Sequence, residues 1–160
     1  MRAAGEIKRL LYYEAYLLDS GLFLQWLDLL APDLRYWAPA RAELSRYQER
    51  EEEAGRLLLF DETKASLTLR IDRLDTGLAW AESPATRTRR FVSNVMVEES
   101  MNDRVRVRSN LMLFRSRSFT DENFLVGSRE DVWTGPEKWL LKERKILIDH
   151  CTVENISLLL

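Results

Sequence analysis

The stretch WAESPATRTRRFVSNVMV, residues 80–97, marks the change of pattern on which the fold depends. Before it, apolar residues recur mostly at helical spacing, and after it they recur mostly at every second position. Pro84 lacks a backbone donor and biases Ser83 away from the helical region, which predicts a turn or extended loop. We interpret the charged run 86–90 as the lining of a surface or interface. From Phe91 we expect a sheet that occupies most of the C-terminal half and packs against the helices of the first half.

Two helices are expected near the N-terminus. Apolar residues spaced i, i+3, i+4, i+8 and i+11 from Ile7 predict an amphipathic helix over residues 5–19. A shorter stripe over residues 22–30 repeats the spacing and stops before Pro32. The two helices pack as a pair in the general sense only, because the second helix has no Lys or Arg with which to read DNA.

The segment that follows combines aromatic residues with proline. Residues 34–39 predict a strand, which we place at an edge of the sheet because proline cannot donate to a ladder. Residues 42–55 are almost wholly polar and are interpreted as a solvated loop or frayed helix, with a specific acidic docking surface as the alternative. Residues 56–60 are interpreted as a short buried strand.

A third helix is expected after residue 60. Asp61 is a candidate N-cap, and Glu62 would be favourable in the first turn. Leu67, Ile71 and Leu74 have helical spacing, although the same region also fits a strand alternation. We favour the helix because the segment is long and begins with a capping residue.

Long strands are expected in the C-terminal half. Residues 104–118 alternate, with Val105 and Val107 on one face and arginines on the other. Strands over residues 124–133 and 138–149 follow, joined by polar loops, which predicts a strongly curved antiparallel sheet. The sequence therefore predicts a single domain over residues 1–160 of the α+β class, with three N-terminal helices packed on a strongly curved, mostly antiparallel sheet. The apolar residues at positions 156–160 are expected to pack against something.

Composition narrows the class of protein. The 160 residues are 46% hydrophobic, which predicts a packed globule, and their net charge of -2 gives no reason to expect a polyanionic partner such as nucleic acid. We expect no membrane span and no signal peptide, and hence a cytoplasmic location. The single cysteine, Cys151, cannot form an intrachain disulfide, in agreement with a reducing compartment.

The inventory of metal ligands excludes several redox sites in this chain. A Rieske cluster needs two Cys and two His, and a non-haem iron facial triad needs two His and a carboxylate. The chain has one Cys and one His. If a redox metal takes part in the function, we expect another chain to carry it.

Five segments in series, residues 14–19, 26–30, 33–37, 87–95 and 144–149, resemble the small (beta) subunit of bacterial aromatic-ring-hydroxylating dioxygenases of the Rieske type. The resemblance implies a cone similar to nuclear transport factor 2, in a complex of three large and three small subunits. It also implies that the large subunit holds the Rieske iron-sulfur cluster and the mononuclear non-haem iron for aromatic hydrocarbon catabolism. This chain would support assembly, without catalytic, cofactor-binding or metal residues. The acidic loop at 47–53 departs from some relatives, so contacts there do not carry over.

Arginines are abundant on the expected strands. A basic sheet face with aromatic residues can hold single-stranded nucleic acid, but the slightly acidic overall balance favours pairing within a trimer or with the large subunit. The candidate subunit-interface residues are Trp37, Arg87, Arg89, Arg90, Arg106 and Arg108.

The sequence leaves two catalytic alternatives open. His150 lies between Asp149 and Cys151, but adjacent residues on a strand point to opposite faces, so a structural or interface histidine is the better interpretation. Cone folds also occur as stand-alone isomerases and dehydratases that use a polar group in the cone to move a proton. Asp33, Tyr36, Asp72 and His150 are the groups that such an enzyme would have available.

Overall fold

The computed structural model describes residues 2–40, 57–75, 86–101, 103–117, 121–135 and 137–150. Its helices are α1 (Arg2–Asp19), α2 (Phe23–Leu27) and α3 (Lys64–Asp75). Its strands are β1 (Leu30–Pro39), β2 (Leu58–Glu62), β3 (Arg87–Ser100), β4 (Arg104–Ser116), β5 (Glu122–Thr134) and β6 (Leu140–Ile148). The predictions for the polar segment 42–55 with its acidic loop, the Pro84 turn, Cys151 and the tail 156–160 lie outside the described residues.

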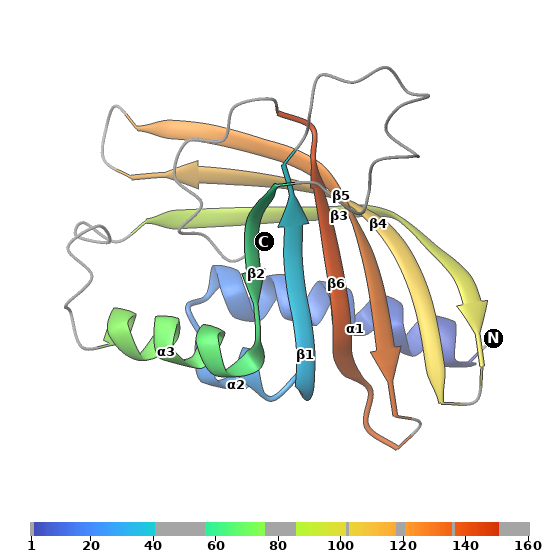
Figure 1. Ribbon diagram of the computed structural model, residues 1–160. Coiled ribbons are helices and arrows are strands. Elements are labelled where there is room, and N and C mark those ends of the chain that lie inside the picture. The colour runs from blue at the N-terminus through green and yellow to red at the C-terminus, as the bar shows by residue number, and fades with distance from the viewer. Residues whose placement is uncertain are drawn as a thin grey trace.

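The strands form one mixed sheet in the order β2-β1-β6-β5-β4-β3. Every neighbouring pair is antiparallel except β1 and β6, which run parallel. α1 packs mainly against β3, α3 packs against β1, and α2 contacts both other helices (Figure 1). We call the sheet face that packs against the helices the inner face, and the opposite face the outer face.

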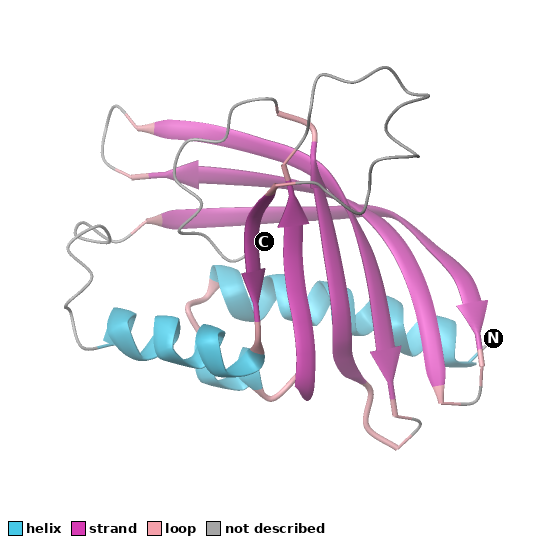
Figure 2. Cartoon of the chain, viewed as in Figure 1, coloured by secondary structure: helices cyan, strands magenta, loops and turns pink. Residues whose placement is uncertain are grey.

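The long strands give the sheet its curvature. β4 and β5 pair without a break from Arg104 with Thr134 to Ser116 with Glu122. β3 shifts register after Ser93, where Asn94 has a φ of 50° and forms an irregularity that bends the strand. Figure 2 shows β3, β4 and β5 bending as they cross the molecule. The prediction of an α+β fold, with helices packed on a curved, mostly antiparallel sheet, is confirmed.

The core lies between α1 and the inner face. Ile7, Leu11 and Leu18 on α1 are buried at the helical spacing that the sequence showed. Buried side chains alternate along β4, where Val105 and Val107 lie on the inner face as predicted. The prediction of the first helix is therefore confirmed, although the helix begins earlier than expected, at Arg2.

The prediction of a short stripe-bearing helix and an edge strand is partly wrong. α2 ends at Leu27, and β1 begins at Leu30, so the strand includes Pro32. β1 lies inside the sheet, between β2 and β6. Proline is tolerated there because the pairing of β1 with β6 shifts between Leu30 and Arg35, and Pro32 falls within that irregularity.

The predicted cap of the third helix is also wrong. Asp61 and Glu62 are the last residues of β2, which is an only partly buried edge strand. Thr63 caps α3 instead: its Oγ1 accepts from the backbone N–H of Ser66 at 3.2 Å, while Ser66 Oγ accepts from the N–H of Thr63 at 2.9 Å. The choice of helix over strand for Leu67 and Ile71 is confirmed, since both are fully buried on α3.

The charged run before Phe91 belongs to the sheet. β3 begins at Arg87, so the strand starts four residues earlier than predicted. Arg87 and Arg89 are exposed, whereas Arg90 is buried against Asp19 at the end of α1. The alternation of a strand, which turns every second residue inward, explains why one charged run has two environments.

Candidate functional site

Four charged side chains are buried together in the centre of the inner face. Arg144 on β6 lies between Asp131 on β5 and Glu14 on α1, and Arg129 on β5 lies beside Glu14. All four are at most 1% exposed. We call these residues the charge cluster. Strand register explains the arrangement, because Arg144 pairs directly with Asp131 and the alternation points both inward.

Both carboxylates of the charge cluster pair mainly with Arg144. Its Nε and Nη2 donate to the two Asp131 carboxylate oxygens at 2.8 and 2.7 Å, and Nη1 and Nη2 donate to Glu14 at 2.6 and 2.8 Å. Trp26 Nε1 donates to Glu14 at 3.1 Å. Arg129 reaches Glu14 only at 3.5 Å. Among the described residues, Nε and Nη2 of Arg129 have no hydrogen-bond partner.

The charges in this cluster fix the protonation state of Glu14. Burial alone raises the pKa of Glu14, but the guanidiniums of Arg144 and Arg129, with hydrogen bonds from Arg144 and Trp26, outweigh it and lower the pKa to about 2. Burial lowers the pKa of Arg144, yet Asp131 and Glu14 raise it well above its ordinary value. Burial, with the neighbouring Arg144, lowers the pKa of Arg129. Glu14 is therefore ionised throughout the physiological range and is not a proton donor.

The four candidate groups for proton transfer do not converge. Asp33 is exposed and pairs with Lys142 at 3.0 Å, and Asp72 is exposed on α3. His150 is exposed, and its Nε2 accepts from the backbone N–H of Val126 at 3.2 Å. Only Tyr36 reaches the charge cluster: its ring lies 5.6 Å from the Arg144 guanidinium carbon, and burial raises its pKa. These four described groups therefore do not form an acid and base pair.

The donor set also does not fit a redox metal. Within the described ranges, no group of three or more His, Cys, Asp or Glu side chains is placed to hold a metal ion. The single His and single Cys of the chain fall short of the ligands that a Rieske cluster needs. In the same part of the chain, no helix is both long and apolar enough to cross a membrane.

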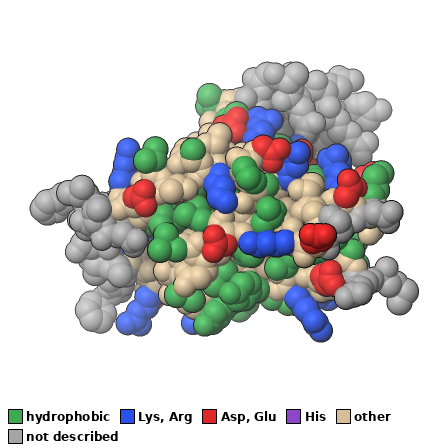
Figure 3. All heavy atoms as spheres, turned by 90° about the horizontal axis from the view of Figure 1, so that it is seen from below, with side chains coloured by type: hydrophobic (Ala, Val, Ile, Leu, Met, Phe, Trp, Pro, Cys, Tyr) green, Lys and Arg blue, Asp and Glu red, His purple; other side chains and the backbone are tan. Residues whose placement is uncertain are grey.

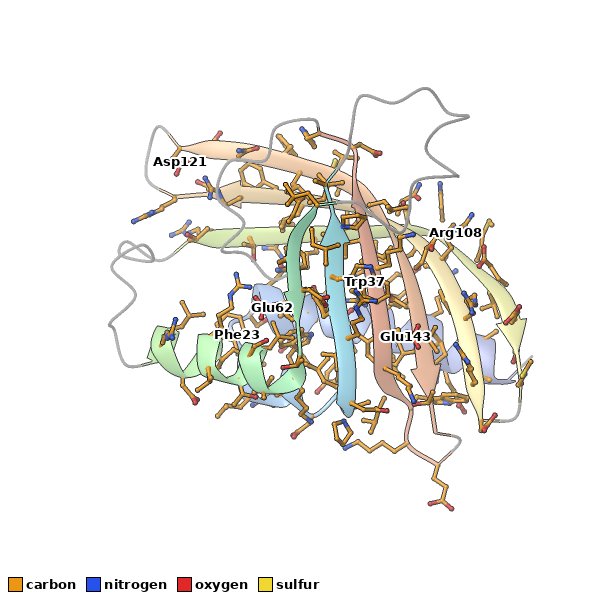
Figure 4. The ribbon with its side chains drawn as sticks, in the orientation of Figure 1. Phe23, Trp37, Glu62, Arg108, Asp121 and Glu143 are labelled. Atoms are coloured by element: carbon orange, nitrogen blue, oxygen red, sulfur yellow. The ribbon has the colours of Figure 1, made fainter. Side chains whose placement is uncertain are left out.

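A row of alternating charges crosses the outer face. Strand register places Trp37 beside Lys145, then Glu130, then Arg108. Arg108 bonds Glu130 at 3.1 Å and Glu98 at 3.2 Å. Figure 4 shows Trp37, Glu143 and Arg108 along β1, β6 and β4 of the sheet.

Beyond an intervening polar row of Ser93, Asn110 and Ser128, the outer face is apolar. Phe91, Met112 and Val126 are direct cross-strand neighbours on β3, β4 and β5, and all three are exposed. In the next row, the rings of Phe114 and Phe124 lie 5.1 Å apart. We call these five residues the outer apolar patch. Exposed apolar side chains gathered on one face are typical of a protein interface.

The structure places the interface candidates in three settings. Arg87 and Arg89 lie on the edge strand β3. Arg89 is the direct cross-strand neighbour of Phe114, so the two arginines border the outer apolar patch. Arg106 and Arg108 lie on the outer face of β4, where Arg106 pairs with Glu99 at 3.6 Å.

The remaining two candidates are engaged within the chain. Trp37 is half-buried, and the Arg35 guanidinium stacks 4.3 Å from its ring. The Asp19 carboxylate accepts from the backbone N–H of Arg90 at 2.8 Å and from its guanidinium, and it also accepts from Thr88. Arg90 therefore joins α1 to β3.

Sequence reasoning did not identify the charge cluster or the outer apolar patch. A signal for the first was present, because Arg129 and Asp131 share the strand phase of Trp133, which is fully buried. The run 111–114, apolar on both faces of a strand, was a signal for the second. Figure 3, a space-filling view from below, shows further hydrophobic side chains exposed between charged ones.

Comparison with known proteins gives matches along nearly the whole chain. The family model for the ring hydroxylating beta subunit matches residues 13–155. The 3-phenylpropionate/cinnamic acid dioxygenase subunit beta of Photorhabdus laumondii is 39% identical over 96% of this chain and 89% of its own length.

Solved structures show the same fold. A chain of naphthalene 1,2-dioxygenase superposes with a TM-score of 0.85 at 24% identity, over 98% of this chain and 84% of that one. The beta subunit of benzoate 1,2-dioxygenase from Burkholderia mallei gives 0.77 at 22% identity, over 97% and 96%. At these identities the likeness concerns the fold.

Proposed function

The chain belongs to the family of ring-hydroxylating dioxygenase beta subunits, and from this membership we propose that it acts as a non-catalytic structural subunit. It is one component of an oxidoreductase complex and has an alpha subunit as its partner. The resemblance noted in the sequence is thereby confirmed, and the alternative of a stand-alone isomerase or dehydratase is not favoured. The family match over residues 13–155 is the observation that carries this proposal.

In this proposal the large subunit holds the Rieske cluster and the mononuclear iron, whose chemistry adds both atoms of dioxygen to an aromatic ring. The residues of this chain hold neither group. Their contribution is geometric: a rigid sheet keeps the large subunits at a separation suited to electron transfer between neighbouring chains. The fixed ionisation of the charge cluster supports this role, because paired buried charges resist rearrangement of α1 against the sheet.

We place self-association at the outer face, with three copies of this domain around a three-fold axis in a hetero-hexamer. The outer apolar patch supplies area to bury, and Arg87, Arg89, Arg106 and Arg108 supply charges that fix register. Trp37 adds an aromatic side chain on the same face. A cytoplasmic location is part of the proposal and is supported by the lone cysteine.

Mass determination in solution tests this assignment, with the chain expressed alone and then together with its large subunit. We expect a trimer alone and an iron-containing complex with equal numbers of large and small subunits. A stable monomer or dimer that does not bind the large subunit would contradict the proposal. Single substitutions in this chain should lower the yield of assembled enzyme before they lower turnover per iron, and a variant with normal assembly, full iron and lost turnover would argue against a purely structural role.

The 39% identical relative suggests which substrates to assay first. That protein is named for 3-phenylpropionate and cinnamic acid, so we propose aromatic rings that carry a short carboxylic acid side chain. Oxygen consumption by the assembled complex should be faster with 3-phenylpropionate than with naphthalene. The reverse order would contradict this substrate class and leave the subunit assignment in place.

A further inference from the structure

The outward side of α1 carries an unusual set of side chains for a helix that faces solvent. Arg9, Tyr12, Tyr13 and Tyr16 are spaced i, i+3, i+4 and i+7, so they form one stripe, with Lys8 beside it. The three tyrosines are 46%, 47% and 59% exposed. We call these five residues the tyrosine face.

The tyrosine face has the composition of a binding surface. The rings of Tyr13 and Tyr16 stack with centroids 6.3 Å apart, so they present a pre-ordered aromatic surface. Tyrosine and arginine are, with tryptophan, the residue types most enriched where binding energy concentrates in protein interfaces. Within the described part of α1, every carboxylate is at least partly buried: Glu14 lies in the charge cluster, and Asp19 bonds Arg90.

We propose that the tyrosine face docks the large subunit, at a surface of that subunit with recesses for aromatic rings and acidic side chains around them. This inference rests on the proposed function, because it takes the large subunit as the partner. The positive charges of this face disfavour a symmetric contact with a second copy of the chain. A two-fold contact of this face with itself would bring Lys8 and Arg9 against like charges, which costs affinity.

The position of the face supports the same choice. α1 covers the inner face of the sheet, whereas the outer apolar patch lies on the opposite side of the same strands. Contacts between copies through the outer apolar patch therefore leave the tyrosine face accessible. The two surfaces then serve two different partners.

The test compares two variants in the assembled complex. Tyr13→Ser/Tyr16→Ser removes two aromatic rings from the tyrosine face, and Leu69→Ser is the matched control, because Leu69 is 61% exposed on α3. Both are co-expressed with the large subunit, and dissociation on dilution is followed by mass photometry. We expect the control to dissociate at the wild-type concentration and the tyrosine variant at a concentration about ten-fold higher or more.

A second measurement needs no variant. Hydrogen–deuterium exchange of α1 should be slower in the complex than in the isolated chain. The docking site would be overturned if the tyrosine variant and wild type dissociated at the same concentration and exchange in α1 were the same in the complex as in the isolated chain. Formation of the complex would in that case still support the proposed function. Loss of the self-associated form of the isolated chain in the tyrosine variant would show a contact between copies and would also overturn it. Failure of wild type to form any complex would refute both proposals.

Discussion

At the scale of single residues, Glu14 has the largest number of consequences. It accepts bonds from Arg144, Arg129 and Trp26, and it joins a helix to two strands that lie more than a hundred positions later in the chain. Replacing one partner of a buried ion pair leaves the others uncompensated. The cost of the change therefore exceeds the worth of any one bond.

We expect Glu14→Gln to lower the free energy of unfolding by about 3–5 kcal/mol, because Arg144 and Arg129 then lie buried beside a neutral amide. Urea denaturation measures the change. Glu143→Gln, on the outer face of β6, is the matched control and should cost less than about 0.5 kcal/mol. Equal effects of the two substitutions would show that the charge cluster does not stabilise the fold.

The same residue sets an acid limit on stability. The pKa of Glu14 falls from an ordinary 4.5 to about 2 in the folded chain, so its contribution is complete above pH 4.5 and is lost as the pH falls through 2. Between pH 5 and 2, wild type should lose about 3 kcal/mol more of its free energy of unfolding than Glu14→Gln does. Parallel pH profiles of the two proteins in urea denaturation would contradict this value.

At the scale of elements, the contact between β5 and β6 depends on a glycine. A Cβ at Gly127 would lie 2.4 Å from the backbone oxygen of Leu147, so a side chain there must push the strands apart. We expect Gly127→Ala to lower the free energy of unfolding by about 1–3 kcal/mol, measured by thermal and urea unfolding.

Gly5 on α1 has open space around its Cβ position, and Gly5→Ala should raise the free energy of unfolding by about 0.5–1 kcal/mol. Destabilisation by both substitutions would contradict this distinction.

Local pattern was sufficient for some elements and not for others. The spacing of Ile7, Leu11 and Leu18 predicted α1, and the alternation of Val105 and Val107 predicted β4, because each element buries one face. The interior position of β1 could not be derived in this way. It depends on pairing with β6, about a hundred residues away, and on an irregularity that accommodates Pro32.

The candidate sites follow the same division. Of the run 86–90, which was expected on a surface, Arg87 and Arg89 are exposed but Arg90 is buried, and a role of these residues in a subunit interface stays a prediction. The charge cluster was not expected, because its members are distant in sequence and a buried charge has no periodic signature. Only the register of β5 and β6 brings Asp131 and Arg144 together.

At the scale of the whole molecule, the C-terminal residues 156–160 lead to a further prediction. Four of these five side chains are apolar, and in water they would be a liability. If the tail packs against its own cone or a neighbour, as its apolar composition predicts, deleting residues 156–160 should lower the melting temperature or reduce trimer formation. Scanning calorimetry and sedimentation measure the two effects, and an unchanged melting temperature with an unchanged oligomer would refute the prediction.

The parallel pairing of β1 with β6 also determines when the chain can fold during its synthesis. Roughly a hundred residues separate the two strands, and ribosomes add about 5–20 residues per second, so β1 leaves the ribosome on the order of 5–20 s before β6 exists. Until β6 is made, Leu34 and Tyr36 lack the neighbouring strand β6, and Glu14 lacks Arg144. Nascent chains therefore expose apolar and charged groups together, which is the condition under which aggregation competes with folding.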